Sequence, residues 1–117
     1  MRNDLLDRLL QFAINVILFL RKIKNTQEAL IIKKQLIKSS TSSGANYEEA
    51  QGGSSKADFT NKTRTALKEM RESNFWLKVI SGTLEDKSLK PECQKLIKES
   101  QELKNILGSI CYKSRAK

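Results

Sequence analysis

Histidine is absent from this chain of 117 residues, and cysteine, proline, glycine and aromatic residues are scarce. Without histidine, His-dependent catalytic triads, most zinc sites and the Glu-x-x-His ligands of di-iron bundles are excluded. No glycine-rich loop follows a strand, as phosphate-binding loops require, and Gly52-Gly53 fits a turn better. We therefore expect no cofactor and no metal, and we expect that the protein is not an enzyme.

The two cysteines, Cys93 and Cys111, lie 18 positions apart in one expected helix. At about 1.5 Å per residue their Cα atoms are roughly 27 Å apart, too far for a disulfide, so we expect reduced thiols. Residues 1–10 contain two aspartates and no secretory cleavage site follows, which favours a cytoplasmic protein. The longest apolar stretch, residues 12–20, is far shorter than the roughly 20 residues that span a bilayer, so we expect no membrane role.

The abundance of leucine, isoleucine, lysine and glutamate favours helix over sheet. Apolar and small residues recur at helical spacing in four segments. These segments are about residues 3–24, 26–51, 55–82 and 89–113. Short connections between most of them predict an all-α, up-down-up-down antiparallel four-helix bundle, in one domain over residues 1–117.

The serine-rich segment 39–44 has the composition of a flexible linker, which would split the chain into two halves. Against that interpretation, its small residues keep the helical phase of Leu36 and Tyr47. We expect a continuous helix there, in which small side chains let a neighbouring helix approach closely. In the last helix the expected buried seam runs through Cys93, Leu96, Ser100, Leu103, Leu107 and Ile110.

The first expected helix carries an apolar arc of roughly 180°, wider than the little over 100° that one intramolecular groove covers. Part of this arc is therefore predicted to face another subunit. The candidate interface residues are Leu6, Leu10 and Ile17.

Lysine and arginine number 22 against 13 aspartates and glutamates, which gives a formal net charge of +9 and makes polyanions plausible partners. The candidate phosphate contacts are Lys33, Lys34, Lys38, Lys62, Arg64, Lys68, Arg71, Lys113, Arg115 and Lys117. Solvation of helix faces explains the same charge equally well. No recognition-helix motif, aromatic stacking platform or arginine-rich arm is evident, so we expect binding without sequence readout.

Four polar residues on or beside the expected inward faces of the second and third helices form a candidate structural cluster. They are Asn46, Glu49, Glu69 and Glu72. Two interpretations have equal support: surface ion pairs with Lys56, Lys68 and Arg71, or a buried hydrogen-bond network that fixes the helix register.

Two motifs in the middle of the chain are specific. Residues 42–50 follow the pattern Ser-x-Gly-Ala-Asn-x-x-Glu-Ala, and residues 66–77 follow Ala-Leu-Lys-Glu-x-x-Glu-x-x-x-Trp-Leu. With these motifs the chain resembles, over roughly residues 4–112, the four helix bundle protein family encoded by intervening sequences in bacterial large-subunit ribosomal RNA genes. It is more distantly similar to the accessory variability proteins of diversity-generating retroelements.

The resemblance implies one long second helix, a homopentamer with a central channel, and no catalytic residues to carry over. Ser43 and Tyr47 depart from the family, which usually has isoleucine at both positions, so local packing is expected to differ. The retroelement relatives imply binding of nucleic acid and of a reverse transcriptase. Two hypotheses follow: a basic oligomeric scaffold for RNA or DNA, or an adaptor that docks a partner enzyme such as a reverse transcriptase.

Overall fold

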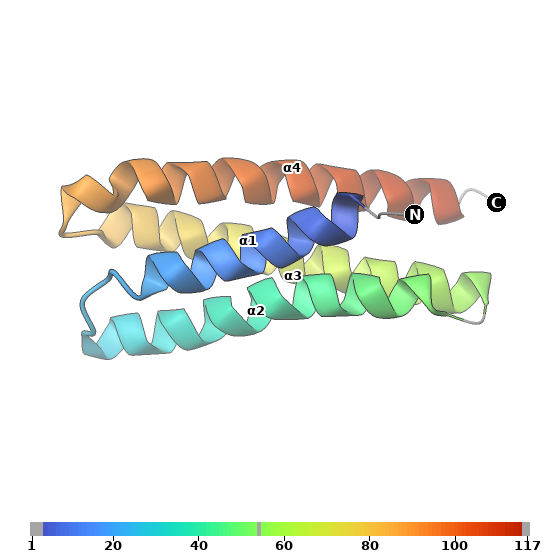
Figure 1. The fold of residues 1–117 in the computed structure, drawn as a ribbon, viewed down its shortest axis with the longest axis horizontal. Coiled ribbons are helices and arrows are strands. Elements are labelled where there is room, and N and C mark those ends of the chain that lie inside the picture. Colours follow the sequence, from blue (N-terminus) through green and yellow to red (C-terminus); the bar gives the residue numbers. More distant parts are fainter. Residues whose placement is uncertain (1–3, 54, 116–117) are drawn as a thin grey trace.

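The computed structural model describes residues 4–53 and 55–115. Its helices are α1 (Asp4–Leu20), α2 (Gln27–Gln51), α3 (Lys56–Thr83) and α4 (Lys90–Arg115), with a short 3-10 turn at Lys87–Leu89 before α4. Each helix packs antiparallel against the next, and α1 also contacts α4, which closes the four-sided bundle (Figure 1). The predicted all-α, up-down-up-down fold is confirmed.

Helix starts follow the expected capping chemistry, because side-chain oxygens accept the first free amide groups. Thr26 caps α2 by accepting from the Ala29 amide at 3.1 Å, and Ser55 caps α3 by accepting from the Asp58 amide at 3.0 Å. The expected extension of the first helix to residue 24 is wrong. The helix ends at Leu20, and Lys33 Nζ donates to the Ile23 carbonyl and to Asn25 Oδ1, both at 2.6 Å. These two bonds fix the connection between α1 and α2.

The core fills the centre of the bundle with large apolar side chains from all four helices. Its fully buried members include Leu9, Phe12, Val16, Phe19, Leu36, Met70, Leu77, Leu103 and Leu107. The seam of α4 ends at buried Cys111 rather than at Ile110, because Ile110 lies on the flank of Glu99, toward α1. Both cysteines are free, as their spacing predicted. Among the helices of the described residues, none is long and apolar enough to cross a membrane.

The serine-rich segment is helical, as its unbroken spacing indicated, and it lies inside α2. Ser39 Oγ is 2.8 Å from Ser73 Oγ, and Ser43 Oγ donates to the Ala66 carbonyl at 2.7 Å. A Cβ added at Gly44 would touch Leu9 Cβ. Small residues therefore bring α2 close to α3 on one side and to α1 on the other.

Candidate functional site

The predicted phosphate contacts do not form a single surface. Lys34 and Lys38 are exposed on the outer side of α2, and Lys113 is exposed near the end of α4. Lys33 is held by the connection between α1 and α2, and Lys62 Nζ pairs with Glu49 Oε1 at 2.7 Å. Lys117 lies outside the described residues. The other predicted contacts, Arg64, Lys68, Arg71 and Arg115, are exposed on α3 and α4.

A stripe of exposed side chains runs along the outer side of α3. It consists of Arg64, Lys68, Arg71, Phe75 and Lys78, at successive steps of four, three, four and three residues. This spacing places all five on one side of the helix, over a length of about 21 Å. On the neighbouring flank of α4, Lys104 and Arg115 are separated by three turns. We call these seven residues the α3–α4 face.

The buried thiol of Cys111 shows that arginines from both helices converge. Burial raises the pKa of Cys111, and the nearby charges of Arg64, Arg71 and Arg115 oppose that rise. These three arginines, up to 51 residues apart in the chain, therefore all lie near enough to Cys111 for their charges to act on its thiol. The α3–α4 face concentrates positive charge that the sequence spreads over two helices.

Most acidic residues of the same two helices lie on other flanks. Glu92 pairs with Lys22 at 2.8 Å, and Glu99 and Glu102 pair with Arg8 at 2.7 and 3.2 Å, so all three face α1. The acidic residues of α3 are Asp58, Glu69 and Glu72. Asp58 and Glu69 have helical positions toward α2, whereas Glu72 lies four residues after Lys68 and three before Phe75, at the border of the α3–α4 face. The carboxylate of Glu72 accepts from Trp76 Nε1.

The four predicted cluster residues do not form one buried network. Glu49 is exposed, and its pairing with Lys62 lowers the pKa of Glu49 and raises that of Lys62. Asn46 Nδ2 donates within α2 to Ser42, and Glu72 accepts from Trp76 Nε1 at 3.0 Å. Glu69 is half-buried. For Glu49 the structure agrees with the ion-pair interpretation, but the partner is Lys62 and not one of the predicted residues.

A buried polar network does exist, and smaller side chains make it. Asn74 Nδ2 donates to Ser100 Oγ at 2.8 Å, joining α3 to α4, while the Ser39–Ser73 contact joins α2 to α3. Thr60, near the start of α3, and Ser114, near the end of α4, are also hydrogen-bonded to each other. Among the described residues, every buried side-chain nitrogen and oxygen has a partner, which favours one register of the helices.

Apolar side chains are exposed on the opposite side of the bundle, along α1 and α2. Leu10, Ile14 and Leu18 of α1 are 62, 40 and 45% exposed, and Leu30 and Ile37 of α2 are 55 and 38% exposed. Their helical positions face outward on the flanks where α1 and α2 meet, and we call this set the α1–α2 edge. Of the predicted interface residues, Leu10 belongs to it, whereas Leu6 and Ile17 are half-buried.

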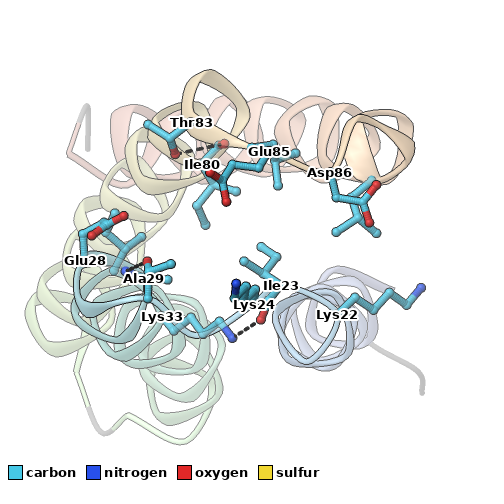
Figure 2. Close-up of a pocket in the computed structure, with 14 residues that line it drawn as sticks. Lys22, Ile23, Lys24, Glu28, Ala29, Lys33, Ile80, Thr83, Glu85 and Asp86 are labelled. Atoms are coloured by element: carbon cyan, nitrogen blue, oxygen red, sulfur yellow. Dashed lines mark hydrogen bonds between the residues drawn. The ribbon is translucent and has the colours of Figure 1, made fainter.

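A pocket of about 310 Å³ lies at the end of the bundle where α1 stops short. Figure 2 shows Ile23 and Ile80 pointing into it from opposite sides. Its rim carries Lys22 and Lys24 as well as Glu85 and Asp86, so it offers no net charge to an ionic ligand. Within the residues that the structure describes, no group of three potential ligands gathers to hold a metal ion.

Comparison with known proteins places this geometry in a family. The model of the 23S rRNA-intervening sequence protein family matches residues 2–109. The chain belongs to this family. It is similar, at 32% identity and a TM-score of 0.79, to a protein of unknown function from the S23 ribosomal protein family of Bacteroides thetaiotaomicron VPI-5482, with 92% of this chain and 97% of that chain covered. No curated protein matches the chain. The family resemblance drawn from the two motifs is confirmed.

For this member of the 23S rRNA-intervening sequence protein family, seven residues of the two surfaces were missed from sequence. Phe75, Lys78 and the half-buried Lys104 extend the α3–α4 face, and the α1–α2 edge gains Ile14, Leu18, Leu30 and Ile37. A signal for Lys78 was present, since it continues the alternating spacing that starts at Arg64. Lys104 could not be assigned in this way, because its place depends on how α4 is rotated against α3.

Proposed function

We propose that the protein is a non-catalytic, oligomeric scaffold that binds RNA or DNA through the α3–α4 face. The observation that carries this proposal is the grouping of charge: basic side chains from two helices share a surface, while the carboxylates of α4 pair with Arg8 and Lys22 on another flank. Basic residues that merely solvate helices are usually interspersed with acidic ones. A continuous positive field attracts a polyanion instead.

The shape of this surface favours contact with the phosphate backbone. Two helices packed side by side are about 20 Å across, whereas the major groove of DNA is about 12 Å wide. The face is therefore too broad to reach base edges in a groove, so we propose binding largely without sequence specificity. Phosphate contacts fix position and orientation but carry no direct sequence information.

Assembly is the second part of the proposal. The α1–α2 edge exposes apolar side chains on the side of the bundle away from the basic face, and such patches are typical of protein interfaces. We propose that this edge joins subunits in a homopentamer, the state that the family resemblance implies. Repetition of the α3–α4 face around an oligomer would multiply the phosphate contacts that one nucleic acid makes.

Salt dependence of binding tests the proposal, measured by fluorescence anisotropy with labelled RNA and DNA of mixed sequence. If about 6–10 phosphates are contacted, affinity falls by roughly 10³ to 10⁵ between about 50 and 200 mM salt, because condensed counterions are released. Sequences of equal length and strandedness bind about equally. No retention of RNA or DNA even at the lowest salt would contradict the proposal.

The second candidate function is a protein adaptor that docks a partner enzyme such as a reverse transcriptase. The exposed α1–α2 edge favours it, because an apolar surface of this kind can receive a partner as readily as a second copy. A chain that stays monomeric, binds no nucleic acid and binds the partner enzyme would support this function over the scaffold.

A further inference from the structure

An aromatic ring stands in the middle of the basic stripe. Phe75 is 57% exposed, with Arg71 one turn before it and Lys78 one turn after it on the same side of α3. The sequence indicated no stacking platform, and the exposed Phe75 ring is the feature that reopens this question. Phenylalanine has no donor for a phosphate, so this ring adds nothing to purely electrostatic binding.

The Phe75 ring is held by its neighbours. It meets the Trp76 ring edge to face, with centroids 5.3 Å apart and planes at 70°, and Trp76 Nε1 in turn donates to Glu72 Oε2 at 3.0 Å. Such aromatic pairs are attractive beyond the area they bury. A ring fixed before binding loses little conformational freedom when a ligand stacks on it.

A ring between cations matches one form of nucleic acid better than another. In a duplex the base faces are stacked on one another, so a surface too broad for the grooves meets mainly phosphates and sugars. In a single strand, unpaired bases can stack on an aromatic side chain while basic residues follow the backbone.

We propose that the α3–α4 face selects single-stranded nucleic acid, with one base stacked on Phe75 and its flanking phosphates held by Arg71 and Lys78. This inference rests on the proposed function, because it assumes that nucleic acid binds this face. It adds a ligand class, unpaired RNA or DNA, and a recognition residue that the basic side chains do not supply.

The test compares Phe75→Ala with the unmodified chain, using labelled single strands and duplexes of about 12 nucleotides, within the roughly 4–16 that single-strand modules cover. Each probe is made both as RNA and as DNA, so that the preference between these two nucleic acids is measured as well. Phe75→Ala is expected to weaken single-strand affinity by about 5- to 150-fold, which corresponds to about 1–3 kcal/mol per stacked base. Duplex affinity stays unchanged.

Two further readouts separate stacking from a structural effect. The slope of log affinity against log salt is expected to stay the same in Phe75→Ala, because the ring contacts no phosphate. Phe75→Tyr should restore affinity, whereas Phe75→Leu, which is apolar but not aromatic, should not. Ile31→Ala is the matched control, because Ile31 is 60% exposed on α2, outside the α3–α4 face.

Unchanged single-strand affinity in Phe75→Ala, or an equal loss for the duplex, would overturn the inference while salt-dependent binding by the unmodified chain still supported the proposed function. Absence of binding to every probe would overturn both.

Discussion

The α1–α2 edge and the α3–α4 face are built from the same kind of helix but expose opposite chemistry. The first exposes leucine and isoleucine, including Leu10; the second exposes lysine and arginine around Phe75. The carboxylates of Glu99 and Glu102 lie between them, where they pair with Arg8 and join α4 to α1. Charge pairing thus joins neighbouring helices at the partly exposed surface of the bundle.

This contrast indicates how a small bundle can separate assembly from binding. An apolar surface is stabilised when a second copy removes it from water, whereas an unpaired basic surface is stabilised by a polyanion. With the two on opposite sides, a subunit can join its neighbours without covering the basic residues. Our proposal predicts that each surface can be disabled while the other keeps its property.

The largest expected effect comes from breaking the α1–α2 edge with charge. Leu10→Lys combined with Leu18→Lys should reduce the mass measured by light scattering from five times 13.3 kDa to that of one chain, because buried unpaired ammonium groups are costly. Both side chains are exposed, so the helix content should persist. Ile31→Lys, on the other flank of α2, is the control and should keep the full mass. An unmodified chain that already scatters as a monomer would contradict this prediction.

A smaller effect is expected in the interior that separates the two surfaces. Ser43 is fully buried where α2 approaches α3, so Ser43→Trp should lower the free energy of unfolding by about 1–3 kcal/mol through overpacking. Urea denaturation followed by circular dichroism measures it. Ala45→Trp, at an exposed position of the same helix, should change stability by less than about 0.5 kcal/mol. Equal stability of the two variants would show that this part of the interior is loose.

The smallest effect concerns Arg8, which links the two halves of the bundle. Its guanidinium donates to Glu99 at 2.7 and 3.0 Å and to Glu102 at 3.2 Å. Because these side chains are about one-third to one-half exposed and screened by salt, Arg8→Gln should cost only about 0.2–1 kcal/mol. The loss should shrink in about 1 M salt. A loss that is unchanged by salt would mean that packing of the arginine stem, and not its charge, holds α1 to α4.

Helical spacing and capping predicted most of the fold. The turn assigned to Gly52-Gly53 separates α2 from α3, and the phase shared by Leu36, the small residues and Tyr47 carried α2 through its serine-rich segment. The early end of α1 was not predicted: residues 21–23 form a turn, and Lys33, ten residues further along, donates to the Ile23 carbonyl beyond the helix end. That contact exists only after α2 has folded back.

The candidate site was predictable only in part, because a helical wheel gives faces within one helix and not their rotation against neighbours. Arg64, Lys68 and Arg71 could be grouped from their spacing, but their meeting with Arg115 depends on how α3 and α4 pair. The prediction of which residues form the polar network failed for a related reason. Long glutamates at the edge of an inward arc extend toward solvent, whereas short side chains such as Ser73 and Asn74 span the narrow gap between helices.

Two matched charge reversals test the central claim most directly. Arg71→Glu with Lys78→Glu alters the α3–α4 face, and Lys34→Glu with Lys38→Glu alters the outer side of α2; each pair lowers the net charge by the same amount. Affinity for a single strand is measured as a function of salt. We expect the first pair to weaken binding by about 100-fold or more and to reduce the salt slope by about 1.4, since each lost contact on a single strand removes about 0.7. The second pair should change affinity by less than about threefold. Equal losses from the two pairs would contradict the account, because net charge alone would then explain binding.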